Sequence, residues 1–175
     1  HQMDRPHPEK VVSKGAVCTK PPTDALVLFD GKNADAFTKA WKVKDGVMIA
    51  SPGSTNSKKS FGSCTLHVEW RIPAGRKVDG QQGGNSGIFL MGKYEIQIQE
   101  SYKNVTYADG QAAAIYGQNP PSVNASVPQG EWQSYDITFA EMTSEEKNRI
   151  SHRARALEKM KKILKTYFEK GEFIE

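Results

Sequence analysis

Alternating polar residues make CTLHVEWRI, residues 64–72, the first candidate for chemistry in this chain. Its polar positions are His67, Glu69 and Arg71. Side chains two residues apart lie on one face of a β-strand, about 7 Å from each other. An imidazole, a carboxylate and a guanidinium in one row can hold different protonation states and stabilise negative charge, as acid–base catalysis requires. The three residues are therefore candidate catalytic residues on a predicted strand.

A second alternating stretch, YEIQIQE at residues 94–100, places Glu95 and Gln97 on the polar face of another predicted strand. If both strands lie in one curved sheet with their polar faces inward, the five side chains line a concave polar surface. Such a surface suits a sugar, which needs many hydrogen bonds and an aromatic wall. The same alternation also fits a half-buried sheet whose polar residues face solvent. The aromatic candidates for the wall are Trp41, Tyr102, Tyr116 and Trp132.

Short apolar stretches between turn residues predict further strands. Asp45-Gly46 has the composition of a two-residue hairpin turn. A glycine-rich loop leads through Asn85 and Ser86, which offer side-chain hydrogen bonds at the rim of the sheet. Strands joined by Gly, Asn and Pro loops, without intervening helices, predict an antiparallel β-sandwich or jelly roll. Besides the two stretches above, the expected elements are strands at 25–32, 88–91 and 132–139 and a hairpin at 41–50.

The two ends of the chain differ from the central part at 24–139. Residues 1–23 are polar and rich in proline, which predicts a leader or linker over the surface. Residues 140–175 begin with a capping-box pattern, and apolar residues then recur at helical spacing. This tail is predicted to be an amphipathic α-helix that docks on the sheet or self-associates. Its apolar strip is Ile150, Leu157, Met160, Leu164 and Phe168.

Composition narrows the classes of partner. The net charge is only +4, and no block of Lys and Arg with interleaved aromatics occurs, so no nucleic-acid partner is expected. No apolar run approaches the ~18 residues of a membrane-spanning helix. The chain has no phosphate-binding loop, dinucleotide fingerprint or zinc-ligand spacing. It begins at His1, which fits a processed, exported protein or a trimmed chain.

From about Ala25 to Phe139 the chain resembles the 3-keto-disaccharide hydrolase family. The matching blocks include LFDGKNADAF, FGSCTLHVEWRIP, GGNSGIFLMGKYEIQIQES, YADGQAAAIYGQNPPSVNAS and GEWQSYDITF. The resemblance implies a concanavalin-like β-jelly roll in periplasmic or secreted bacterial proteins that act on oxidised sugars. Glu100 departs from the family pattern, which has Asp there. The residues that match the family's motif positions are His67, Glu69, Arg71, Asn85, Ser86, Tyr94, Glu95 and Gln97.

The activity that this resemblance implies is cleavage of a 3-keto-glycoside by elimination and hydration. Glu69 or His67 is the expected base, Arg71 or a divalent cation stabilises the enolate, and Glu95 is a second acid/base or a metal ligand. A carbohydrate-binding domain without catalysis is the alternative. The expected substrate-binding residues are Asn85, Ser86, Tyr94, Gln97, Tyr116 and Trp132.

The tail segment FAEMTSEEKNRISHRARALEKMKKIL resembles the C-terminal end of the inosine/xanthosine triphosphate pyrophosphatase family. In that family the Ser-His-Arg segment, here Ser151, His152 and Arg153, helps to bind the purine base. The phosphate-binding loop and the catalytic acidic residues of that family have no counterpart in this chain, so pyrophosphatase activity is a lesser alternative. Two unrelated resemblances that meet near Phe139 and Ala140 give the chain the character of a chimera.

Overall fold

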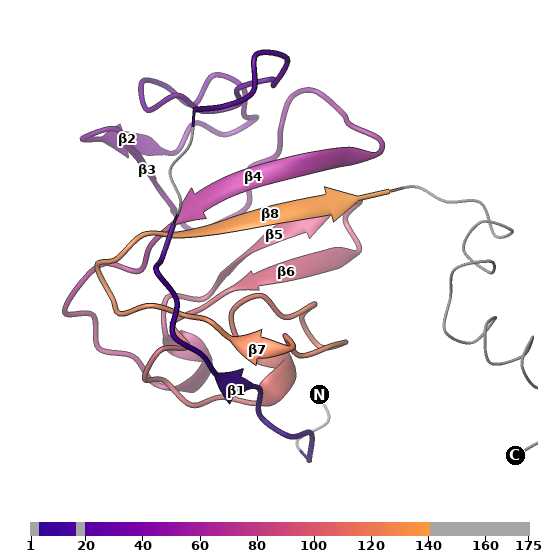
Figure 1. The fold of residues 1–175 in the computed structure, drawn as a ribbon. Helices are drawn as coiled ribbons and strands as arrows, with labels where there is room; N and C mark the ends of the chain where they lie inside the picture. Colours follow the sequence, from indigo (N-terminus) through magenta and orange to yellow (C-terminus); the bar gives the residue numbers. More distant parts are fainter. Residues whose placement is uncertain (1–3, 17–19, 141–175) are drawn as a thin grey trace, which may run out of the picture. The chain divides into compact units, whose positions relative to one another are not determined.

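The computed structural model describes residues 4–16 and 20–140 of the chain. The chain divides into two compact units, His1–Phe139 and Ala140–Glu175. All the elements described below belong to the first unit (Figure 1). The predicted C-terminal helix and the segment Ser151–Arg153 lie outside the described residues.

The described residues form strands and two 3-10 turns, with no α-helix among them. A mainly β fold is therefore confirmed. The long strands are β4 (Cys64–Trp70) and β8 (Gln133–Phe139), and the medium ones are β5 (Ser86–Leu90) and β6 (Tyr94–Ile98). The remaining elements are β1 (Glu9–Lys10), β2 (Lys42–Lys44), β3 (Val47–Ile49), β7 (Val123–Asn124), η1 (Gly80–Gln82) and η2 (Ala108–Gly110).

Each described sheet has two strands. β4 pairs antiparallel with β8, β5 with β6, and β2 with β3, whereas β1 and β7 are parallel. In the β4–β8 ladder His67 lies opposite Asp136, and Val68 lies opposite Tyr135. Directly opposite residues share a face, so one face of this sheet is polar and the other is apolar.

The core lies between the β4–β8 sheet and β6. Trp70, Ile72 and Ala112 are its buried residues, and Val68, Ile98 and Tyr135 pack against them. The ring centroids of Trp70 and Tyr135 are 5.3 Å apart, a distance at which tilted aromatic rings attract each other. The predicted alternation of β4 is thus confirmed: its apolar residues face the core, and Thr65, His67, Glu69 and Arg71 are exposed.

Two of the smaller predictions have different outcomes. The hairpin at 41–50 is confirmed, with Asp45 and Gly46 at φ 52° and 75°, the left-handed pair that a type I′ turn requires. The strand at 25–32 is wrong: no residue there belongs to a strand, and Leu26 and Val27 are 56% and 50% exposed. An apolar run becomes a strand only where a neighbour supplies a ladder, and none of the described strands pairs with this segment.

Part of the predicted leader is joined to the rest of the unit. β1 pairs with β7, and the amide of Ala16 donates to the carbonyl of Trp132 at 2.8 Å. Gly15 lies so close to Trp132 that a Cβ on it would stand 2.8 Å from the same carbonyl oxygen. This segment therefore lies against the start of β8.

Candidate functional site

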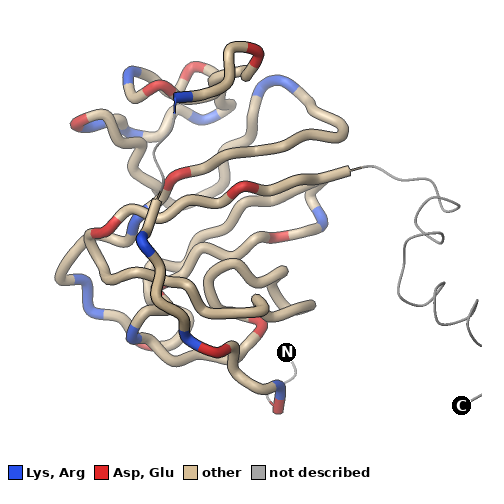
Figure 2. Tube along the Cα trace, viewed as in Figure 1, with Lys and Arg blue, Asp and Glu red and all other residues tan. Residues whose placement is uncertain are grey.

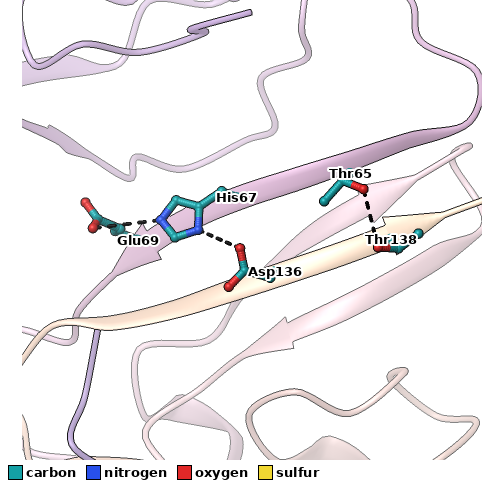
Figure 3. Close-up of polar contacts among 5 residues, drawn as sticks. All are labelled: Thr65, His67, Glu69, Asp136 and Thr138. Atoms are coloured by element: carbon teal, nitrogen blue, oxygen red, sulfur yellow. Dashed lines mark hydrogen bonds and ion pairs between the residues drawn. The ribbon is translucent and has the colours of Figure 1, made fainter. Parts of the chain in front are cut away.

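A row of polar side chains runs along the outer face of the β4–β8 sheet (Figure 3). His67 Nδ1 is 2.7 Å from Asp136 Oδ1, and His67 Nε2 is 3.8 Å from Glu69 Oε1. The side chains of His67, Glu69 and Asp136 are 40%, 37% and 71% exposed. Solvent screens charges at such positions, and exposed ion pairs contribute at most about 1 kcal/mol. Asp136 is not among the site residues predicted from the sequence, although it lies on the polar face of its predicted strand.

Arg71 continues the same face of β4. Its guanidinium carbon lies 4.8 Å from the centre of the Trp132 ring, a cation–π distance. Two residues from the predicted set therefore meet here. The contact occupies one face of the indole, which was a candidate for the sugar-binding wall.

The single concave surface that combines β4 and β6 is not present, and this prediction is corrected. The two strands belong to different sheets. On β4, Val68 and Trp70 face the core, so His67 and Glu69 point away from it. On β6, Ile98 faces the core, so Glu95 and Gln97 point away from it, on the other side of the core from His67. The two predicted groups lie on opposite sides of the core because a strand has two faces and each uses its apolar face for packing.

A separate group, here called the Glu95 cluster, consists of Glu95, Tyr107 and Tyr116. The hydroxyl oxygens of Tyr107 and Tyr116 are 2.6 Å apart, and their ring centroids are 6.3 Å apart. The amide of Tyr116 donates to the carbonyl of Glu95 at 2.9 Å, which attaches the loop to β6. Tyr116 was predicted from the sequence, but Tyr107, in a loop of unpredictable path, was not.

The electrostatics of this cluster are perturbed. Burial raises the pKa of the Glu95 carboxyl above its usual value. Burial, the hydrogen bond to Tyr116 and the negative charges of Asp109 and Glu95 raise the pKa of Tyr107. A carboxylate that binds its proton more readily, beside a hydroxyl that keeps its own, is an arrangement suited to proton transfer.

Gly87 makes room for the Glu95 carboxylate. A Cβ on Gly87 would stand 2.2 Å from Glu95 Oε1 and 2.6 Å from its Cγ, well inside any real contact. The φ of Gly87 lies outside the left-handed region, so the glycine is required by this contact and not by its backbone. Gly87, the glycine of the Asn-Ser-Gly segment, therefore leaves the space that the side chain of Glu95, a candidate catalytic residue, occupies.

Amide side chains form the base of the cluster. Gln97 is fully buried, and its Nε2 donates to Gln81 Oε1 at 3.1 Å; Asn85 Nδ2 donates to the same oxygen at 3.2 Å. Gln81 in turn donates to Thr106 Oγ1 at 2.6 Å. Gln81 thus accepts hydrogen bonds from two residues that were predicted from the sequence, Asn85 and Gln97. Nothing in the sequence around Gln81 indicated this role. Gln97 is buried, Gln81 is half-buried and Asn85 is exposed, and the hydrogen bonds among these amides hold the strand and its covering loop in one arrangement.

Two predicted binding residues lie elsewhere on the β5–β6 hairpin. Tyr94 is 42% exposed, and its ring centroid is 6.5 Å from that of Phe139. Ser86 opens β5 opposite Ile98 and is half-buried. Neither makes a hydrogen bond to Glu95, Tyr107 or Tyr116 among the described contacts, so both remain predictions as substrate-binding residues.

Charge and metal-ligating groups are dispersed over the first unit. Figure 2 shows acidic and basic positions interspersed along the described trace. Within residues 4–16 and 20–140, no three His, Cys, Asp or Glu side chains come together as a metal site. No helix in that part of the chain is long and apolar enough to cross a membrane.

The sequence profile of the 3-keto-alpha-glucoside-1,2-lyase-like domain matches residues 24–150. This chain belongs to that family. The profile covers both β4 and the Glu95 cluster, so both groups of polar residues belong to the 3-keto-alpha-glucoside-1,2-lyase-like domain. The resemblance expected from the central blocks of the sequence is confirmed.

A solved structure supports the fold of this domain. The chain is similar to a candidate glycosyl hydrolase from Parabacteroides distasonis, with 42% sequence identity and a TM-score of 0.66. The similarity covers 70% of this chain and 55% of that protein. The relative is thus considerably longer than the part that matches.

The second resemblance is also confirmed. The chain is 37% identical to the dITP/XTP pyrophosphatase of Thermococcus kodakarensis over an alignment of 93 positions, and this alignment covers 47% of this chain and 50% of that enzyme. It is 74% identical over 31 residues to the dITP/XTP pyrophosphatase of Clostridium perfringens, 18% of this chain and 15% of that enzyme. The chain therefore spans half or less of the length of these curated relatives.

Proposed function

We propose that this chain cleaves 3-keto-glycosides at the Glu95 cluster, on a sandwich of the jelly-roll type. The observation that carries the proposal is the half-buried Glu95 carboxylate, whose pKa is raised by burial, beside the Tyr107–Tyr116 hydroxyl pair. Membership of the 3-keto-alpha-glucoside-1,2-lyase-like family and similarity to a candidate glycosyl hydrolase support a carbohydrate substrate. The sequence alone favoured Glu69 or His67 as the base, but their exposure makes Glu95 the better choice.

The reaction uses the acidity of a hydrogen next to a ketone. In a 3-keto-glycoside the hydrogen on C2 is adjacent to the C3 carbonyl, and the Glu95 carboxylate removes it to leave an enolate. The enolate electrons then form the C1–C2 double bond, and the bond from C1 to the glycosidic oxygen breaks. Water adds its hydroxyl to C1 and a proton returns to C2, so the net reaction is hydrolysis. A carboxylate whose pKa is raised is the stronger base for the first step.

The tyrosines have the complementary task. The Tyr107 hydroxyl is protonated at neutral pH, as an ordinary phenol is, so it donates a hydrogen bond to the developing enolate or a proton to the departing oxygen. Asn85, exposed at the edge of the amide network, is placed to contact a sugar hydroxyl. Gln97 is fully buried, and we assign it the task of holding the base of the cluster rather than touching substrate.

Matched glutamate variants test the assignment. Glu95→Gln should reduce turnover of a 3-keto-disaccharide by roughly 10²–10⁴-fold, because it removes the base at nearly constant shape. Glu69→Gln, on the exposed face of β4, should leave turnover within about twofold. Glu69→Gln should keep the melting temperature of the parent, and Glu95→Gln should not lower it, because the ionised half-buried carboxylate that it removes is unfavourable to the folded state. Thermal unfolding followed by circular dichroism would verify both.

The opposite pattern, with Glu69→Gln inactive and Glu95→Gln active, would move the base to β4. A third result has a separate meaning. If calorimetry detects binding of the 3-keto-disaccharide to the parent chain while no product forms, the chain is a carbohydrate-binding domain and catalysis is excluded.

A further inference from the structure

A small depression lies on the first unit where four segments of the chain meet. Its volume is about 120 Å³, and we call it the Ser13 pocket. Ser13 and Gly15 come from the N-terminal segment, Ala112 and Ala113 from the loop after η2, and the other sides come from residues 123–126 and the start of β8. It is distinct from the Glu95 cluster, none of whose three residues lines it.

The lining of the Ser13 pocket is polar but uncharged. Four of the residues that line it are polar, namely Ser13, Ser126, Gln133 and Ser134. The other lining residues are Gly15, Tyr135, Val123 and three alanines, and none of the residues that line the pocket is charged. Hydroxyls and an amide around small apolar surfaces match the alternating hydroxyl and C–H groups of a sugar ring, whereas an ion would find no opposite charge.

The walls of the pocket are held in place by backbone contacts. Gly15 lies against Trp132, and its φ of 78° is in the left-handed region that glycine adopts without strain. Ala113 has a φ of 67°, which is costly for a residue with a Cβ. Its amide donates to the carbonyl of Gln97 at 3.0 Å and to the Tyr135 hydroxyl at 2.9 Å. Strained backbone conformations that the surrounding structure holds in place occur preferentially at binding sites and active sites.

Size limits the ligand. A single water needs only about 10–15 Å³ of such space, and pockets for drug-sized molecules have about 300–1,000 Å³. The Ser13 pocket lies between these values, so it can take one small ring and not a disaccharide. We infer that the Ser13 pocket binds one uncharged monosaccharide unit, independently of catalysis at Glu95.

The N-terminal segment supplies a matched pair of variants. Ser13 lines the pocket and is half-buried, whereas the side chain of its neighbour Val12 is fully exposed. Isothermal titration of the full chain with glucose should detect millimolar binding. Ser13→Trp fills the pocket and should weaken that binding at least tenfold, while Val12→Trp should leave it unchanged. Gluconate, which carries a charge, should bind more weakly than glucose.

The Glu95→Gln variant separates this inference from the proposed function, and it should bind glucose as the parent does. If glucose binds Ser13→Trp and Val12→Trp equally, or does not bind the parent chain, the inference is wrong. If Glu95→Gln alone abolishes glucose binding, the sugar occupies the Glu95 cluster; the Ser13 pocket is then rejected while the proposed function stands.

Discussion

Substitution of Gly87 by alanine would test whether this glycine exists to accommodate Glu95. The added methyl would stand 2.2 Å from Glu95 Oε1, whereas ordinary contact begins at 3.4 Å, so the carboxylate must move by about 1 Å. A misplacement of that size in a catalytic group costs roughly 10²-fold in rate. We therefore expect kcat/KM for a 3-keto-disaccharide to fall about 100-fold in Gly87→Ala.

The effect on stability should depend on whether Glu95 is present. With the glutamate in place, its displacement into a poorer rotamer costs about 0.5–1.5 kcal/mol, which offsets the roughly 0.4–1 kcal/mol that Gly→Ala contributes by restricting the unfolded chain. In a Glu95→Ala background the three atoms nearest to the added methyl are absent, so Gly87→Ala should stabilise by about 0.4–1 kcal/mol. The coupling between the two positions is then about 1 kcal/mol.

Urea denaturation of the four proteins in this double-mutant cycle measures the coupling. Activity is measured only in the proteins that retain Glu95. An identical stability change in both backgrounds would mean that Gly87 and Glu95 do not interact in solution. Full activity of Gly87→Ala would separately refute the role of Glu95 as base.

Two further predictions concern pH and the core. Because burial raises the pKa of Glu95 from its reference value of 4.5, the carboxyl ionises first in the unfolded chain. Its contribution to stability should therefore fall as the pH rises from 4.5 to the folded pKa, and stay constant above it. Turnover should rise over the same interval as Glu95 loses its proton. Melting temperatures and turnover rates measured from pH 4 to 8 should show both pH dependences in the parent chain and neither in Glu95→Gln. Trp70→Ala should lower the free energy of unfolding of the first unit by about 3–5 kcal/mol, since Trp70 is 6% exposed and packs on Tyr135. Urea denaturation measures this change, and the control Val12→Ala, at a fully exposed position, should change stability by under about 0.5 kcal/mol. A loss below 1 kcal/mol at Trp70 would contradict the assignment of the core.

Short-range patterns in the sequence predicted several strands and one turn of the fold correctly. The alternation in residues 64–72 predicted correctly which side of β4 is buried, and Asp45-Gly46 predicted the β2–β3 turn. Both follow from physics that acts within a few residues. The segment at 25–32 failed because an apolar run does not reveal whether a neighbouring strand will pair with it.

The arrangement of the site depended on information that a single strand does not contain. The alternation in residues 64–72 and 94–100 shows which side chains of each strand share a face, but not whether the two strands belong to one sheet. In the structure β4 pairs with β8, which places His67 and Glu95 on opposite sides of the core. Tyr107 and Gln81 were missed for a related reason: they reach Glu95 and Gln97 through loops, whose paths follow tertiary contacts.

The pairing of β4 with β8 also sets the order in which the chain can assemble. Residues 71–132 separate the two strands, so closing this loop costs about 3 kcal/mol more than closing the two-residue turn between β2 and β3, at about 0.6 kcal/mol for each doubling of length. At about 5–20 residues per second, a ribosome needs roughly 3–12 s to synthesise the intervening chain. During that interval Trp70 has no Tyr135 to pack against, although the β5–β6 hairpin can already form. β4 is thus the segment of the nascent chain that most needs protection from aggregation until β8 has emerged.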